Sequence, residues 1–263
     1  MIMNYLKIIG TYFRLGALNE LEYRANFWVQ MLESTVNLIV ALGGLAVVFA
    51  HTETLAGWSP NQLIALVGIY TLVAGFIRLV ISPSLERFMA DVREGTLDFT
   101  IIKPVDAQLL VSIQRIEIWK MVDVFLGFVV IGVALGRMGR AIGWADTAVF
   151  TVAIFAGVVI VYSFWLMLAT LAFWFVRTEN LLVIFDAMYK AARWPVSIYP
   201  DWLRFTLTFM VPIAFAVTVP AEGLTGKLAT NTLLLAIGLA AAIFVAARLF
   251  WRFGIRFYSG ASA

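Results

Sequence analysis

The chain contains no cysteine among its 263 residues, so disulfide bonds and thiolate chemistry are excluded. His51 is the only histidine, which excludes every metal site built from several histidines. Charged residues make up only 13% of the chain, whereas 62% of the residues are hydrophobic and the mean hydropathy is +0.93. So little polar surface cannot cover a water-soluble domain. The composition therefore predicts an integral membrane protein.

Motifs for enzymatic chemistry are also missing. The nearest approach to a phosphate-binding loop is AEGLTGK, in which Ala221 replaces the first glycine and Leu228 follows where Ser or Thr should hold magnesium. His51 has no acid near it in sequence beyond Glu53, so a nucleophile of the Ser, His and Asp type is not expected. We therefore expect no enzyme, no metal or cofactor in this chain and no nucleic-acid partner. Any active transport needs a separate ATPase or an ion gradient.

What the sequence does contain is a series of long apolar stretches. A helix needs about 20 apolar residues to cross a hydrocarbon core of about 30 Å. The sequence predicts an all-α integral membrane protein, with one transmembrane domain over residues 1–263. Six spans are expected, at 27–50, 63–81, 121–136, 147–176, 181–198 and 232–251.

Two further apolar segments are expected to lie at the membrane surface. Residues 1–24 carry apolar side chains along one helical face, but Gly10 and Arg14 interrupt the run, which favours an interfacial helix over an additional span. Residues 199–226 are apolar but contain three prolines. Broken backbone survives near lipid only where protein or water satisfies its polar groups, so we expect short re-entrant helices on the external side.

Charge is concentrated in one polar segment, residues 84–106, which reads SLERFMADVREGTLDFTIIKPVD. Its first half is predicted to be a short amphipathic helix, because apolar residues recur there at helical spacing. These apolar residues are Leu85, Phe88, Met89 and Val92. Gly95 follows directly and favours a helix end, since glycine tolerates a left-handed backbone. We expect a helix, a turn and an extended segment outside the membrane, where a soluble protein can bind them.

The distribution of basic residues predicts the orientation. Under the six-span arrangement, thirteen of the nineteen Lys and Arg residues lie on the side of the two termini and of residues 84–106, and six lie on the other side. Basic residues are enriched on the cytoplasmic side of membrane proteins. We therefore expect both termini and the polar segment to be cytoplasmic.

Two charges fall inside the expected span 181–198. Asp186 and Lys190 are four residues apart, so they share a helical face and can neutralise each other. Charges at membrane depth usually mark a functional path, and a purely structural pair is an equally good interpretation here. Trp194 and Tyr199 follow near the expected external boundary, as interface anchors or as the border of a transport path.

Small residues at a spacing of four predict close helix approach, either within the bundle or with a second copy. Gly132 and Gly136 have this spacing in the third expected span, and Gly238 begins a similar series in the last.

The order of these elements resembles that of ABC-2 type permeases, the membrane subunits of ATP-binding-cassette transporters. The resemblance covers essentially the whole chain and includes three motifs: GTLD at 95–98, KPVD at 103–106 and YSGAS at 258–262. It implies a permease subunit of an exporter, located in the inner (plasma) membrane and in contact with lipid. It also implies two copies of a cytoplasmic ABC ATPase, which bind ATP and Mg, and a second permease that is identical or related.

The resemblance further implies where the ATPase acts. In such permeases the helix between the second and third spans couples ATP hydrolysis to transport, with Phe88 and Met89 here as its apolar knob. The candidate coupling residues are Leu85, Glu86, Arg87, Phe88, Met89, Asp91, Val92 and Glu94. The alternative interpretation is a solvated loop held by its own charge pairs, such as Arg87 with Asp91.

A second function class stays open at this point. An ion-coupled secondary transporter would use Asp186 and Lys190 as its polar path, together with Glu33 and Asp123. That class requires repeated halves around broken helices, and the sequence contains no convincing duplication.

Overall fold

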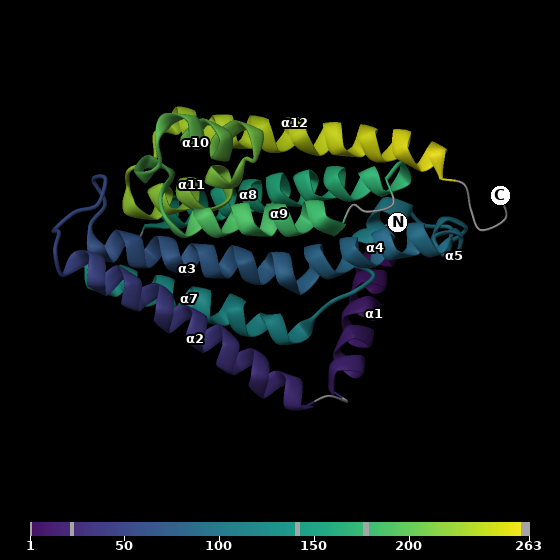
Figure 1. Ribbon diagram of the computed structural model, residues 1–263, viewed down its shortest axis with the longest axis horizontal. Helices are drawn as coiled ribbons and strands as arrows, with labels where there is room; N and C mark the ends of the chain where they lie inside the picture. Colours follow the sequence, from purple (N-terminus) through teal and green to yellow (C-terminus); the bar gives the residue numbers. More distant parts are fainter. Residues whose placement is uncertain (1, 22–23, 140–142, 176–178, 259–263) are drawn as a thin grey trace.

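The computed structural model describes residues 2–21, 24–139, 143–175 and 179–258. Every regular element in these ranges is a helix, which confirms the all-α prediction. Most of the long helices run side by side in an elongated bundle (Figure 1). The α-helices are α1 (Ile2–Leu21), α2 (Arg24–Phe49), α3 (Pro60–Phe76), α4 (Ser82–Glu94), α5 (Asp98–Ile101), α6 (Ala107–Ile113), α7 (Met121–Met138), α8 (Trp144–Thr170), α9 (Glu179–Tyr189), α10 (Asp201–Phe205), α11 (Ile213–Thr225) and α12 (Thr230–Gly254).

Five helices of the described ranges are long and apolar enough to cross a membrane. They are Asn26–Phe49, Pro60–Glu94, Ile118–Met138, Trp144–Phe173 and Thr230–Phe257. They match five of the six expected spans. Helix α1 is not among them and lies steeply across the bundle axis (Figure 1), and its place at the membrane interface stays a prediction.

The expected span 181–198 has a different structure. Helix α9 has 11 residues, which cover about 16 Å and so only half of a hydrocarbon core. The chain then tightens into the 3₁₀ turn η4 (Lys190–Arg193), and Trp194 adopts an extended backbone. A residue before proline is restricted in this way, and Pro195 follows. The prediction of one continuous helix was therefore wrong here.

Residues 199–226 form a bent pair of helices. The segments Asp201–Met210 and Ile213–Thr225 meet at 98°, with Pro212 at the break. Both lie at the end of the bundle that also holds the connection between α2 and α3 (Figure 1). The Lys227 ammonium donates to the Gly57 carbonyl in that connection. The segment is therefore two helices that meet at nearly a right angle, the geometry of a broken span or of a re-entrant loop.

Helix α3 is the centre of the bundle, since 72% of its apolar window is buried. It packs against α7 through glycines. A Cβ atom added to Gly127 would lie 2.6 Å from the Leu72 backbone nitrogen, so only glycine fits there. Within the bundle, the close approach expected at Gly132 and Gly136 is wrong, because an added Cβ would meet no described atom within 4 Å at either position. The spacing of four does not identify the glycines that α3 contacts.

Candidate coupling surface and charged cavity

The helix of the polar segment is an extension of the second span. Helix α3 continues through the π-helical turn η1 (Ile77–Ile81) into α4, so Pro60 to Glu94 is one helix of 35 residues. It ends at Gly95, which adopts φ 71° in the left-handed region, as the sequence predicted. The first half of the polar segment therefore continues the second span as one stiff helix.

The apolar face of α4 is internal. Leu85 and Phe88 are 0% exposed and Met89 is 3% exposed. The Phe88 ring packs 5.0 Å from the Trp251 ring on α12 and 5.5 Å from the Phe173 ring (centroid distances). A partner cannot touch these residues in this structure, so the expected apolar knob is part of the permease core.

The polar residues of α4 organise the turn that follows. The Arg87 guanidinium lies 2.9 Å from the Asp91 carboxylate, which confirms the expected pair. The Thr96 hydroxyl donates to the same carboxylate, and the Asp91 carbonyl accepts from the amides of Thr96 and Leu97. Glu86, Arg87 and Glu94 remain exposed, whereas Val92 is half-buried.

An exposed apolar tip lies beyond this turn and was missed in the sequence. Leu97 is 0% exposed and anchors the short helix α5, whereas Phe99 and Ile102 are 70% and 76% exposed. Exposed Lys103 and Pro104 follow. The only signal in the sequence was the apolar run inside the polar segment, FTII at 99–102.

The KPVD motif follows the tip in the chain and connects it to α6 and α12. The Asp106 side chain accepts from the Leu109 amide at 3.2 Å and so caps α6. The same carboxylate forms an ion pair with Arg248 of α12, and Arg248 also donates to the Gln108 amide oxygen at 2.7 Å. The hydrogen bond from Arg248 lowers the pKa of Asp106, against an opposing effect of burial. The loop is thus tied to the last span.

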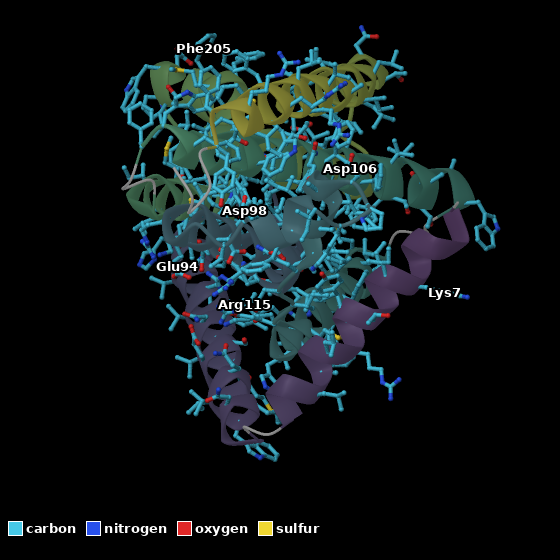
Figure 2. The ribbon with its side chains drawn as sticks, turned by 90° about the vertical axis from the view of Figure 1, so that its right-hand side faces the viewer. Lys7, Glu94, Asp98, Asp106, Arg115 and Phe205 are labelled. Atoms are coloured by element: carbon cyan, nitrogen blue, oxygen red, sulfur yellow. The ribbon has the colours of Figure 1, made fainter. Side chains whose placement is uncertain are left out.

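Seen from this end of the molecule, Glu94, Asp98, Asp106 and Arg115 lie on the face toward the viewer (Figure 2). The C-terminal end of α12 reaches the same end as α4 and α5 (Figure 1). The structure therefore brings the GTLD and KPVD motifs together at one end of the bundle. Of the YSGAS motif, residues 259–262 lie outside the described residues.

The expected charged pair connects α9 with the turn η4. The Lys190 ammonium is 3.3 Å from the Asp186 carboxylate, which confirms that the two charges neutralise each other. The Tyr199 hydroxyl donates to the Ala191 carbonyl at 2.9 Å, and Trp194 is half-buried. Tyr199 thereby holds the turn after α9, and neither aromatic ring stands free at the surface.

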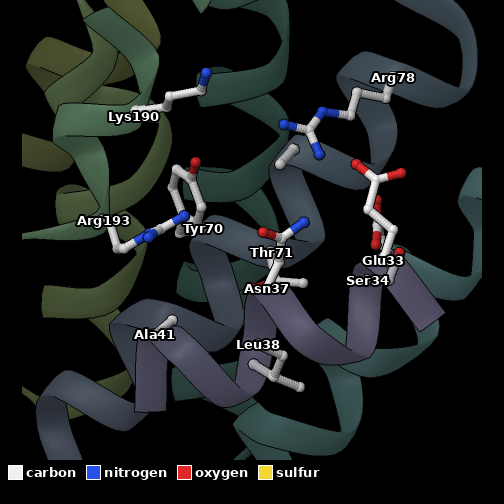
Figure 3. A pocket seen from close by; sticks show the side chains of 12 residues that line it. Glu33, Ser34, Asn37, Leu38, Ala41, Tyr70, Thr71, Arg78, Lys190 and Arg193 are labelled. Carbon is white, nitrogen blue, oxygen red and sulfur yellow. The ribbon is translucent and has the colours of Figure 1, made fainter. Parts of the chain in front are cut away.

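A cavity of about 230 Å³ lies next to Lys190, between α2, α3 and η4 (Figure 3). Its charged lining residues are Glu33, Arg78, Asp123, Lys190 and Arg193. A second cavity of about 510 Å³, on the other side of Arg78, is lined by Asp186 and Glu86 among others. The described residues contain no group of three or more His, Cys, Asp or Glu side chains placed to hold a metal ion.

The family model described as "ABC-2 family transporter protein" matches residues 35–262 of the chain. No curated protein and no solved structure matches it. The family supplies membrane components that are generally not catalytic and that work with an ABC ATPase. The chain therefore belongs to the ABC-2 transporter family and is a multi-pass membrane permease of an ABC transporter.

Proposed function

We propose that this chain is the permease subunit of an ABC exporter, driven by two copies of a cytoplasmic ABC ATPase. ATP and Mg bind to the ATPase, and a second permease, identical or related, completes the membrane part. Export is proposed because the permeases that the chain resembles mostly serve exporters. The protein lies in the inner (plasma) membrane with both termini in the cytoplasm.

The observation that carries this proposal is the apolar tip at α5. Two large apolar side chains, Phe99 and Ile102, are exposed beyond the end of a continuous helix and are flanked by charged residues. An apolar centre within a polar rim is the usual anatomy of a protein interface. The Asp106–Arg248 pair ties this tip to α12, so a force on the tip reaches two spans.

Co-purification tests the docking surface. The double variant Phe99→Asp and Ile102→Asp places two charges on the tip and should abolish recovery of the ATPase with the permease. Trp144→Asp is the matched control, since Trp144 is 92% exposed at the start of α8, away from the tip. Retention of the ATPase by the double variant would refute the assignment.

Cysteine labelling tests the orientation, because the chain has no native cysteine to remove. Lys103→Cys lies on the tip and His51→Cys lies at the opposite end of the bundle. A membrane-impermeant maleimide should label His51→Cys in intact cells and should label Lys103→Cys only after permeabilisation. The reverse pattern would place the tip outside the cell, where no ATPase acts.

The ion-coupled carrier is not favoured, because the chain belongs to the ABC-2 family. The two functions differ in their energy source. Transport by the assembled complex should stop when the ATPase is inactivated, and it should persist when the ion gradient is collapsed with ATP present.

A further inference from the structure

The cavity between α2, α3 and η4 lies deep within the membrane-spanning part of the bundle. The Arg193 guanidinium carbon lies 5.4 Å from the centre of the Tyr70 ring, which is a cation–π contact. Tyr70 is ten residues from Pro60, where α3 begins, so it lies about 15 Å along the helix, near the middle of a core of about 30 Å. Arg193 is therefore a charge at mid-membrane depth, where charges usually serve function.

The positive charges on one wall of the cavity are not all neutralised. Lys190 has its partner in Asp186. Arg193 makes no ion pair with any described residue, and its Nε atom is buried without a hydrogen-bond acceptor. Arg193 and Lys190 belong to the same 3₁₀ turn, in which residues three apart share a face.

Of the two acids that line the cavity, Glu33 lies away from Arg193. The Glu33 side chain on α2 reaches toward Arg78, on the opposite side of the cavity from Lys190 and Arg193 (Figure 3). Asp123 belongs to α7 and lines the same cavity. The wall formed by η4 therefore has a surplus of positive charge and of hydrogen-bond donors.

Resting on the proposed transport function, we infer that this cavity binds the anionic group of the substrate, a phosphate or a carboxylate carried on an amphipathic molecule. The Arg193 guanidinium presents donors in a planar fork that matches such oxygens. Tyr70 packs against the guanidinium and is itself stacked on Tyr189, with ring centres 5.2 Å apart. Lys190, although it is paired with Asp186, adds further N–H donors at the same wall.

The size and the surroundings of the cavity specify the rest of the ligand. A volume of about 230 Å³ accommodates a head group, since a water molecule takes about 30 Å³ of liquid. Leu38, Ala41 and Ala74 supply apolar lining beside the charged groups. Helix α2 is only 6% buried across its apolar window, so the cavity adjoins a helix that faces mainly outward. An apolar tail can therefore remain in the hydrocarbon while the anionic group enters.

Binding to the purified full-length permease in a neutral detergent tests this inference without the ATPase. The probes are dodecyl phosphate, inorganic phosphate and dodecyltrimethylammonium, titrated in the same detergent and followed by microscale thermophoresis. Dodecyl phosphate should bind, and Arg193→Gln should weaken it at least tenfold, because hydrogen bonds to charged groups contribute strongly. Inorganic phosphate that binds equally well, with the same loss in Arg193→Gln, would identify a free anion as the ligand.

Control variants separate binding from folding. Arg193→Lys keeps the charge and should retain more affinity than Arg193→Gln, and Arg204→Gln should change nothing, since Arg204 pairs with exposed Asp201 outside the cavity. If Arg193→Gln does not fold, Lys190→Gln at the same wall replaces it and should weaken binding severalfold. Unchanged affinity in the folded variants, or preference of the wild type for the cationic amphiphile, would overturn the inference. Neither result affects co-purification of the ATPase, so the two proposals fail separately.

Discussion

Truncation of two phenylalanines distinguishes a core position from a docking position. Phe88 on α4 is 0% exposed, and its ring packs against Trp251 of α12 and Phe173. Phe88→Ala should therefore lower the free energy of unfolding by about 3–5 kcal/mol, as large-to-small core changes do. Phe99 is 70% exposed, so Phe99→Ala should change the stability of the free permease by less than about 0.5 kcal/mol.

The effect on ATPase binding should be reversed. A phenylalanine buries about 200 Å² when it is fully covered, so the exposed 70% of Phe99 offers about 140 Å² to a partner. At about 25 cal/mol per Å², this area corresponds to at most about 3.5 kcal/mol, and part of it is lost to ordering on binding. We expect a loss of about 2 kcal/mol, or roughly thirtyfold in affinity, for Phe99→Ala.

Two measurements on the same samples check these values. Unfolding in mixed micelles gives the stability of each variant, and titration of the ATPase onto immobilised permease gives its affinity. Ile102→Ala is a second variant of the tip and should resemble Phe99→Ala. The reasoning is refuted if Phe88→Ala keeps wild-type stability but loses the ATPase, because Phe88 would then be the docking residue.

The remaining predictions concern the packing of α7 and the ion pair between Asp106 of the KPVD motif and Arg248. Gly127→Ala should destabilise the bundle by about 1–3 kcal/mol, because the new Cβ would overlap the Leu72 backbone. Gly132→Ala has open space around it and should be neutral or slightly stabilising. Thermal unfolding compares the two variants, and equal melting temperatures would contradict this packing. Asp106→Asn should cost about 1 kcal/mol near neutral pH, since both partners of the ion pair are about one-third exposed. The pKa of Asp106 is lowered from its ordinary value of 3.8, so the stabilisation by its carboxylate is complete above that value and disappears as the pH falls through the lower folded-state pKa. If the wild type stays more stable than Asp106→Asn at still lower pH, the ion pair is not the source of the difference in stability. The charge exchange Asp106→Arg with Arg248→Asp should restore part of the loss.

The sequence predicted the parts of the fold that depend on local hydrophobicity and on turn chemistry. Five helices long enough to span, the helix end at Gly95 and the Asp186–Lys190 pair follow from apolar length, glycine conformation and helical spacing. These features need no knowledge of distant contacts. The same is true of the bent pair at Pro212, where the missing amide hydrogen breaks the helix.

The coupling surface could not be predicted in this way, because amphipathic spacing does not say what covers the apolar face. Phe88 and Met89 have the pattern of an exposed knob, but Trp251 and Phe173, distant in sequence, cover Phe88. The contact of Arg193 with Tyr70 was missed for a related reason. The span 181–198 was taken to be one helix, which placed Arg193 near the outer boundary, whereas η4 holds it against Tyr70.

The continuity of the helix from Pro60 to Glu94 has a mechanical consequence. This helix of 35 residues is about 52 Å long and has no loop between Pro60 and Glu94, where the turn to the tip begins. Its one irregular section is the π turn at Ile77–Ile81, which contains Arg78, a residue that lines both charged cavities. A bend at this turn would tilt α4 relative to α3. A movement of the tip, driven by a bound ATPase, would then change the size of both charged cavities.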